Sequence, residues 1–303
     1  MKRRFLITSA VIAGAMALTS CAGSDPLSSG SEAGSGSGSD VIIGSADFSE
    51  SQLVATIYSL ALQDAGIEVT EKFNIGSREV YIAAVQDGSI DLVPEYSGAL
   101  LKYLDAEAKA SESGEVLDAL AELLPDDLTT LAPADAQNKD TLAVTEATAK
   151  QYGLTTISDL AEVAGELSLG GPPEWKTRVN GVVGLESVYG LTFKEFVSLD
   201  AGGPLTLTAL VNNQVQVADV FGTDPAIESE KLVVLEDDKS LFAAENVVPV
   251  ISTEKSSDEI TSVLDQVSAK LTTEGLIEMN GRIAAGDSLT DIATDWLKSS
   301  DLI

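Results

Sequence analysis

The feature that most constrains the fold is an alternation of short apolar runs with amphipathic segments, which begins at Val41. The runs predict strands and the segments between them predict helices, in chain order at 41–45, 49–65, 67–73, 78–86 and 90–93. The first helix has Asp47 or Ser49 available as its N-cap, and the two helices end at Gly66 and Gly88. Strands that alternate with helices predict an α/β fold with a mostly parallel sheet.

The rest of the chain continues the same pattern. We expect further helices at 115–124, 183–189, 205–211, 260–271 and 290–297, and one more that begins with Ser158 as its N-cap. Further strands are expected at 141–144, 167–169, 215–220 and 232–235. Roughly 260 residues are enough for two lobes of ordinary domain size. The chain is expected to cross between the lobes near 137–141 and 245–250. The first lobe then comprises 41–138 and 246–303, and the second comprises 139–245.

Two strands of this pattern echo each other. Residues 90–98 and 215–223 each form a short apolar run that ends in an aromatic residue, Tyr96 or Phe221, followed by small or hydroxyl residues. An open parallel sheet binds its ligand at the carboxyl ends of its strands. Two such ends in two lobes would therefore face each other across a cleft, and each would offer a ring to a small molecule.

The N-terminus predicts export and a lipid anchor. Residues 1–21 join a basic start (Lys2 to Arg4) to an apolar stretch and end in Leu-Thr-Ser-Cys, which resembles a bacterial lipobox with Cys21 as the acylated residue. An ordinary signal peptide cut nearby is the alternative, and Arg3-Arg4 is an imperfect twin-arginine motif. Residues 22–40 are rich in Gly and Ser and predict a flexible tether. We expect the domain to face outside the cytoplasm, held at the cell membrane by the lipid alone.

Charge and composition exclude several classes of function. The chain has 48 acidic residues and 18 basic ones, of which three lie in the leader. This excess argues against binding to nucleic acid or to anionic lipid headgroups, and it favours solubility and, mildly, cationic ligands. The chain has no histidine, and Cys21 is its one cysteine. We therefore expect no imidazole base, thiol nucleophile, metal site or organic cofactor.

A set of motifs then resembles a known family. The motifs are Gly44 to Glu50, Asp91 to Gly98, Glu174-Trp175 with Arg178 and Gly181, Tyr189-Gly190, Thr223-Asp224 and Leu235 to Asp238. In order and spacing they resemble the substrate-binding lipoproteins of osmoprotectant ABC importers, over essentially all of 41–303. The resemblance implies a two-lobed type II periplasmic-binding-protein fold. It also implies a quaternary ammonium ligand of the glycine betaine, choline or carnitine type in the interlobe cleft, and ABC permease subunits as partners.

The resemblance also implies site residues. Tyr96 matches a tyrosine of the aromatic cage and Phe221 a frequent aromatic position, while packing roles are the alternatives. Arg178 matches a position that holds a ligand carboxylate, or else it forms a surface salt bridge. Thr223 and Asp224 are ligand contacts or, with Pro225, a helix N-cap. Phe48 and Ser97 lie in matching motifs and complete this part of the predicted site.

The departures from the family change the expected chemistry. Ala46 stands where the family often has a lysine, and Asp140, Glu245 and Asn246 fall where tyrosines are expected. The ligand cation would then be bound by carboxylates as well as by aromatic rings. We expect such a site to favour a ligand with net positive charge, such as choline, or one with N–H groups, over a zwitterion such as glycine betaine.

Other classes of protein fit less well. A carboxylate pair of the glycosidase type is not ruled out by the number of acidic residues, but no recognisable catalytic spacing is present, so we expect no enzyme. An adhesion protein would need no paired strand ends. Two alternatives are left by the sequence. One is the same fold with a rebuilt pocket for another small polar or cationic solute, and the other is a ligand sensor in place of a transporter component.

Overall fold

The computed structural model describes residues 40–303. The predicted signal peptide, the lipobox Cys21 and the tether up to residue 39 lie outside the described residues. Within 40–303, every helix is too short or too polar to cross a membrane.

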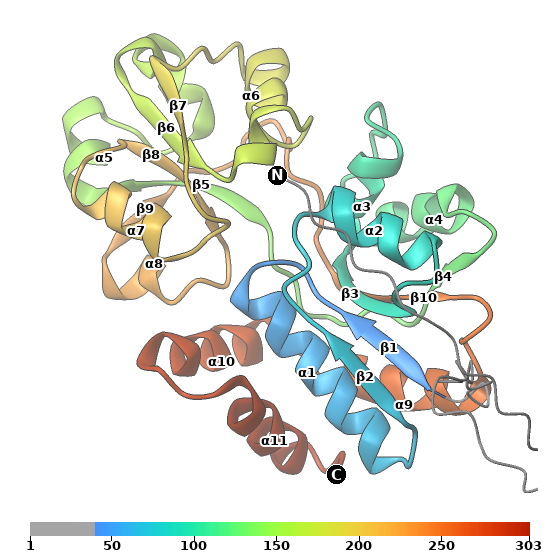
Figure 1. Ribbon diagram of the computed structural model, residues 1–303. Helices are drawn as coiled ribbons and strands as arrows, with labels where there is room; N and C mark the ends of the chain where they lie inside the picture. Colours follow the sequence, from blue (N-terminus) through green and yellow to red (C-terminus); the bar gives the residue numbers. More distant parts are fainter. Residues whose placement is uncertain (1–39) are drawn as a thin grey trace, which may run out of the picture. The chain divides into compact units, whose positions relative to one another are not determined.

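The first of two sheets is built from both ends of this region (Figure 1). Its strand order is β2-β1-β3-β10-β4, with β1 at Val41–Gly44, β2 at Val69–Lys72, β3 at Leu92–Tyr96, β4 at Leu128–Thr130 and β10 at Val247–Ser252. Strands β1, β2 and β3 are parallel, whereas β10 runs antiparallel to both β3 and β4. This sheet therefore joins residues that are about 150 positions apart in sequence.

Helices cover both faces of the first sheet. One face packs against α1 (Ser49–Asp64), α9 (Asp258–Ser268), α10 (Thr273–Ala285) and α11 (Leu289–Ser299), and the other against α2 (Arg78–Gln86), α3 (Ser97–Leu104) and α4 (Ser113–Leu123). Helix α1 is buried along most of its length because α9 and α11 flank it. Strand β3 lies between the two layers, and all five of its residues are buried.

The second sheet has the order β7-β6-β8-β5-β9. Its strands are β5 at Asp140–Thr145, β6 at Ser168–Gly171, β7 at Glu195–Ser198, β8 at Val217–Phe221 and β9 at Leu232–Val234. The helices of this region are α5 (Glu146–Tyr152), α6 (Val182–Tyr189), α7 (Pro204–Val211) and α8 (Ala226–Ser229), with 3-10 helices at Ile157–Glu162, Ala164–Glu166 and Pro173–Lys176. Two apolar cores, one on each face, pack these elements against the sheet.

The two segments that connect the sheets run side by side. Gln137 and Asn246 form an isolated antiparallel bridge, and the Asn138 amide donates to the Glu245 carbonyl at 3.1 Å. On the side of the first sheet, the Ala134 amide donates to the Val247 carbonyl at 2.8 Å. The double crossover is thus a short hydrogen-bonded ribbon that leads into β5 in one direction and into β10 in the other.

The α/β fold of the type II class is confirmed, but the expectation of mostly parallel sheets is wrong for the strands that follow the crossovers. Strand β10 pairs antiparallel with β3, and β5 pairs antiparallel with β8. The reason is that β3 and β8 end at the edge near the crossovers, while β5 and β10 begin there. Both sheets are therefore mixed.

Some local predictions were also wrong. Helix α1 begins after Phe48, and neither Asp47 nor Ser49 caps it. The segment expected after a Ser158 cap is a 3-10 helix capped by Thr156. The Thr156 side chain accepts from the backbone amide of Asp159, and the Asp159 side chain accepts from the backbone amide of Thr156. Helix α10 was missed because glycines at 275 and 281 weaken its helical signal.

Candidate functional site

A cavity of about 60 Å³ lies between elements of the two sheets, next to the crossovers. From the first sheet and its helices it is lined by the β1–α1 loop, the start of α2 and the end of β3. From the second it is lined by the start of β5, the end of β8 and the Pro173–Lys176 segment. Asn138 and Glu245 add side chains from the crossovers themselves. The ends of β3 and β8 thus contribute to one cavity, as the echo in the sequence predicted.

Three aromatic rings from both parts of the fold meet at this cavity. Phe48 precedes α1, Tyr96 ends β3 and Phe221 ends β8. The ring centroid of Phe48 lies 5.7 Å from that of Tyr96 and 5.1 Å from that of Phe221, with tilted planes. These separations are typical of favourable aromatic pairs, so the rings hold one another in place.

A buried carboxylate orients Tyr96. One carboxylate oxygen of Glu50 in α1 accepts hydrogen bonds from the Tyr96 hydroxyl and from the side-chain amide of Asn138, each at 2.8 Å. The other oxygen accepts from the Thr223 hydroxyl and, at 2.6 Å, from Asn280 in α10. The four donors come from β3, a crossover, the loop after β8 and α10. Glu50 therefore joins both lobes behind the aromatic rings.

Arg78 in α2 lines the cavity and is engaged by Glu95 of β3. The guanidinium donates from Nε and Nη2 to the two carboxylate oxygens at 2.7 and 2.9 Å, and the Tyr81 hydroxyl donates to the same carboxylate at 2.7 Å. Burial opposes the charged form, but the Glu95 carboxylate outweighs it and holds the pKa of Arg78 well above its ordinary value. Arg78 and Glu95 thus form a buried, bidentate ion pair.

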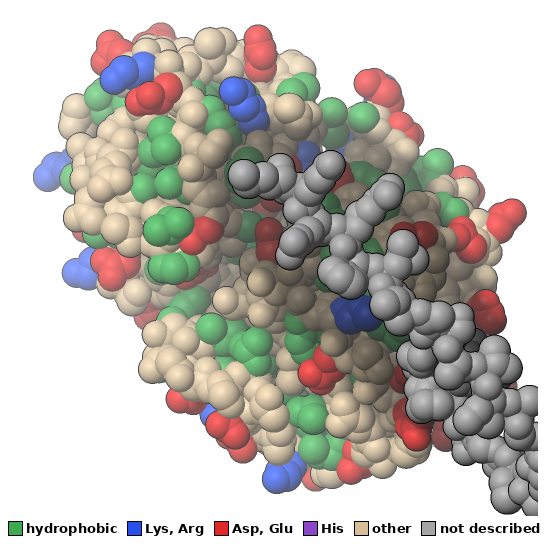
Figure 2. Space-filling view, viewed as in Figure 1, with side chains coloured by type: hydrophobic (Ala, Val, Ile, Leu, Met, Phe, Trp, Pro, Cys, Tyr) green, Lys and Arg blue, Asp and Glu red, His purple; other side chains and the backbone are tan. Residues whose placement is uncertain are grey.

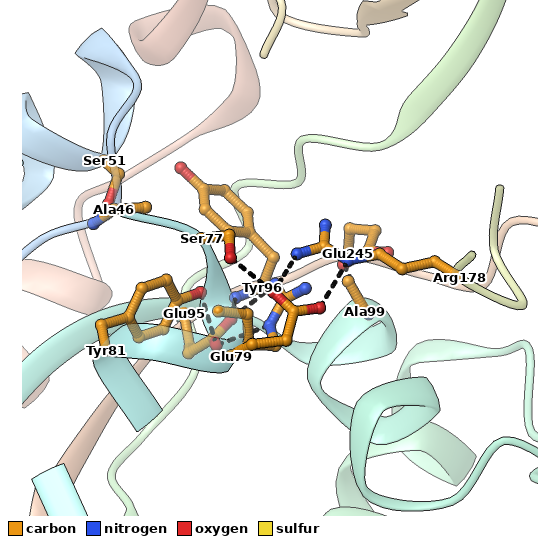
Figure 3. A network of polar contacts seen from close by, with 11 residues as sticks. Ala46, Ser51, Ser77, Glu79, Tyr81, Glu95, Tyr96, Ala99, Arg178 and Glu245 are labelled. Atoms are coloured by element: carbon orange, nitrogen blue, oxygen red, sulfur yellow. Dashed lines mark hydrogen bonds and ion pairs between the residues drawn. The ribbon is translucent and has the colours of Figure 1, made fainter. Parts of the chain in front are cut away.

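Arg178 is engaged in the same way, but across the two lobes. It lies in the loop after the Pro173–Lys176 segment, and it donates from Nε and Nη2 to the two oxygens of Glu79 in α2 at 3.1 and 2.9 Å (Figure 3). Ser77 also donates to Glu79, at 2.6 Å. Partial burial opposes ionisation, yet these hydrogen bonds lower the pKa of Glu79 to about 2.

Carboxylates from the second sheet and the crossover face the same cavity. Asp140 at the start of β5 accepts from the Trp175 indole at 3.2 Å and from the Asn180 amide at 3.0 Å. Glu245 accepts from the Ala99 amide at 2.9 Å. Burial raises the pKa of Asp140, and burial followed by the charge of Asp140 raises the pKa of Glu245 to about 8.

Asp219 is the third carboxylate, and it differs from the other two. It lies on β8 opposite Leu142, is fully buried and lines the cavity. Neither of its carboxylate oxygens has a hydrogen-bond partner among residues 40–303. Burial and then the charge of Asp140 hold its pKa well above the ordinary value.

This inward cluster contrasts with the outer surface. On the face shown in Figure 2, acidic side chains are spread widely rather than gathered in one patch. Within the described part of the chain, no group of three or more His, Cys, Asp or Glu side chains is arranged to hold a metal ion. The cavity itself combines aromatic rings with acidic side chains, and ring faces attract organic cations.

The structure brings together six of the ten predicted ligand-binding residues at the cavity: Phe48, Tyr96, Asp140, Arg178, Phe221 and Glu245. Thr223 and Asp224 instead line an adjoining groove of about 520 Å³. There the Asp224 carboxylate accepts from the backbone amide of Ala226, the first residue of α8, at 2.8 Å, while the N-cap position of that helix is occupied by Pro225.

Ser97 and Asn246 lie outside the cavity lining. The Ser97 hydroxyl donates to the Ala244 carbonyl at 3.1 Å and accepts from the Asn246 amide at 3.0 Å. The Asn246 side chain donates to the Ala134 carbonyl at 2.8 Å and accepts from Ser113 at 2.6 Å. Both side chains fasten the crossover to the first lobe rather than face a ligand.

Sequence reasoning missed several residues of the site. Arg78 and Tyr81 were assigned only to a helix, Trp175 was left without a role, and Glu50 and Asp219 were given none. Asp219 carried a signal, because an acidic residue inside an apolar strand run is unusual. Glu50 carried none, since its partners lie up to 230 positions away.

Comparison with known proteins places the chain in a family. Residues 39–299 match the model of the substrate-binding domain of the ABC-type glycine betaine transport system. A glycine-betaine-binding protein of Pseudomonas aeruginosa is 30% identical over 278 residues, 86% of this chain and 88% of that protein. The carnitine transport binding protein OpuCC of Listeria monocytogenes is 29% identical, over 81% and 82% of the two chains.

Solved structures agree with this placement. The crystal structure of a glycine betaine/carnitine/choline ABC transporter protein superimposes with a TM-score of 0.68 and 27% identity, over 87% of this chain and 99% of that one. The fold, the cavity between its two lobes and the match over residues 39–299 lead to one conclusion. This chain belongs to the family of substrate-binding domains of ABC-type glycine betaine transport systems.

Proposed function

We propose that this protein captures a quaternary ammonium solute of the glycine betaine, choline or carnitine type between its two lobes and delivers it to the permease subunits of an ABC importer. The names of its relatives support this class of ligand. We assign residues 41–138 with 246–303 to one lobe and residues 139–245 to the other.

The observation that carries the proposal is the meeting of Phe48, Tyr96 and Phe221 at a cavity lined by carboxylates. A quaternary ammonium has no N–H group, so it is bound through ring faces, dispersion and net charge. A ring face within about 6 Å of such a cation contributes roughly 0.5 to 2 kcal/mol. A bound cation favours the ionised forms of Asp140, Asp219 and Glu245, and a water-excluding cavity strengthens their attraction to it.

Closure of the lobes follows from where these groups lie. Tyr96 and Phe48 belong to the first lobe, while Phe221 and Asp140 belong to the second, so the lobes must approach for the site to form. The paired crossovers at Gln137 and Asn246 are the segments that can absorb the change in backbone angles. The ion pair of Arg178 with Glu79 joins the two lobes and so stabilises the closed form.

The test is a thermal-shift and calorimetric screen of the purified full-length protein. The compounds are choline, carnitine, glycine betaine, proline betaine and ectoine, with amino acids and sugars as controls. Mass action predicts about 4 kcal/mol of stabilisation for a micromolar ligand supplied at millimolar concentration. Stabilisation by a quaternary ammonium compound supports the proposal, and binding of amino acids or sugars alone would contradict it.

We further propose that Cys21 is acylated and anchors the protein on the outer side of the cell membrane. This follows from the lipobox-like sequence before the only cysteine of the chain. A Cys21→Ala variant is expected to leave the membrane fraction and enter the soluble exported fraction. Membrane retention of that variant would count against the lipid anchor.

A further inference from the structure

Acidic residues outnumber basic ones in the lining of the cavity. Five acidic residues line it, Asp47, Glu174, Asp140, Asp219 and Glu245, and burial raises the pKa of the last three. The two arginines that also line it already face carboxylates of their own, each through two hydrogen bonds. Among the residues described, the cavity therefore offers no unpaired positive charge to a ligand carboxylate, whereas it offers a cation several acidic side chains whose ionised form that cation would stabilise.

Asp219 is the fully buried carboxylate of this lining that has no donor within residues 40–303. Asp140 accepts from Trp175 and Asn180, and Glu245 accepts from a backbone amide. Asp219 is fully buried, and both of its oxygens lack a partner within residues 40–303. A buried acceptor without a donor destabilises a fold, and a charged one does so more strongly.

The register of the second sheet aims these groups at one place. Asp140 lies opposite Phe221, and Asp219 lies opposite Leu142, so the two acidic residues and Phe221 share one face of the sheet. That face meets the cavity, where Phe221 belongs to the aromatic set. A ligand cation held at the rings therefore lies beside the carboxylates.

A quaternary ammonium group alone satisfies only half of this arrangement. Its charge lowers the pKa of the acidic side chains beside it and stabilises their ionised form, but it has no N–H or O–H group to donate to the oxygens of Asp219. A ligand carboxylate would place a further negative charge beside them with no unpaired cationic side chain to balance it, which is unfavourable. The site is therefore complementary to a cation that carries a separate donor and no carboxylate.

We propose that Asp219, assisted by Glu245 and Asp140, is the residue that makes this site select a ligand of net positive charge with a hydroxyl or amine donor, and reject zwitterionic betaines. This rests on the proposed function as a quaternary ammonium receptor and narrows its substrate class. Choline represents the selected class, and glycine betaine represents the rejected one.

The experiment measures the affinities of four compounds by calorimetry on the full-length protein. Choline carries both charge and donor, its O-methyl ether lacks the donor, glycine betaine adds a carboxylate, and ethanolamine is a protonated amine with a hydroxyl. The variant is Asp219→Asn, which keeps the shape and removes the charge. Asp118→Asn on the exposed side of α4 is the matched control, because it makes the same change of charge away from the cavity.

We expect the native protein to bind choline at least about tenfold more tightly than its O-methyl ether or glycine betaine, as a charge-assisted hydrogen bond implies. Asp219→Asn is expected to lose at least about tenfold for choline and to leave glycine betaine unchanged or tighter. Asp118→Asn is expected to match the native protein. If Asp219→Asn fails to fold, Glu245→Gln is expected to shift the same ranking in the same direction.

Two results would overturn the inference while leaving the proposed function intact. One is a native protein that binds glycine betaine as tightly as choline, and the other is an equal loss of both ligands in Asp219→Asn. If no quaternary compound binds, the proposed function fails. Binding of ethanolamine that depends on Asp219 would then still support the selection of donor cations, and absence of all binding would overturn both.

Discussion

The ring of Tyr96 and its hydroxyl do different things, and substitutions can separate them. The hydroxyl donates to Glu50 behind the cavity, while the ring packs against Phe48 and lines the cavity itself. The first interaction bears on the stability of the fold and the second on the binding of a cation.

Tyr96→Phe and Tyr96→Leu form a matched pair, because both lack the hydroxyl and only the first keeps a ring. We expect both to unfold more readily than the native protein. The Leu variant should bind a quaternary ammonium ligand roughly 2- to 30-fold more weakly than the Phe variant, as the loss of one cation–π contact implies. Equal affinities of the two variants by calorimetry would show that the ring serves packing alone.

The raised pKa of Glu245 makes the stability of the fold depend on pH. Its pKa is raised to about 8 by burial and by the charge of Asp140, with Glu95 in the same direction and Arg78 and the Ala99 amide opposing. A carboxyl group with a raised pKa in the folded state stabilises the fold at low pH. That contribution is lost as pH rises from the ordinary value towards about 8. Asp140 and Asp219 shift in the same direction and add to the effect.

We therefore expect the free energy of unfolding of the ligand-free protein to fall as pH rises from about 5 to 8. Glu245→Gln should flatten this slope, because the amide does not titrate. Urea unfolding at a series of pH values measures both slopes. Parallel slopes for the native protein and the variant would refute the role of Glu245.

At the scale of elements, local sequence predicted most helices and strands but not how they meet. The bounds of α2 at Arg78–Gln86 agree with the expectation because the apolar spacing and the glycine after it are local signals. A surface salt bridge was one of the two roles expected for Arg178, but its partner in α2 was not predicted. Glu79 and Arg178 are 99 positions apart.

The pairing of Glu79 with Arg178 also predicts how that arginine acts. Both side chains are partly exposed, so a double-mutant cycle with Glu79→Gln and Arg178→Gln should give a coupling of only about 0.2 to 1 kcal/mol, weaker at high salt. Ligand dissociation should be faster in either variant, because the pair joins the two lobes. A selective loss of carboxylate ligands in Arg178→Gln would show instead that Arg178 binds the ligand.

At the scale of the whole described molecule, Glu50 is the point where the lobes and the crossover are joined. Its four donors come from parts of the chain that no local pattern connects. A carboxylate accepts all four bonds through its two oxygens, whereas an amide presents N–H groups to some of these donors, so the two acceptor oxygens of Glu50 hold the junction together.

Glu50→Gln is expected to lower the free energy of unfolding by about 3 kcal/mol, because it leaves buried donors without an acceptor. The variant should also show a larger radius of gyration in small-angle scattering without ligand, since the junction of the lobes is weakened. Glu122→Gln on α4, which is exposed, is the control. A Glu50→Gln variant as stable as that control would contradict the role of the junction.

The sequence by itself determined the α/β class, most element positions, the paired strand ends at Tyr96 and Phe221, and the approach of Asp140 and Glu245 to the cavity, because these follow from local periodicity and from family motifs. Only the tertiary structure decided that β5 and β10 pair antiparallel with β8 and β3, and that Arg78 and Arg178 each pair with a glutamate. It also decided the junction at Glu50 and the lack of a hydrogen-bond donor to the Asp219 carboxylate within residues 40–303. Hydrogen bonds and burial depend on which distant residues meet in space, and no pattern of neighbours along the chain specifies that.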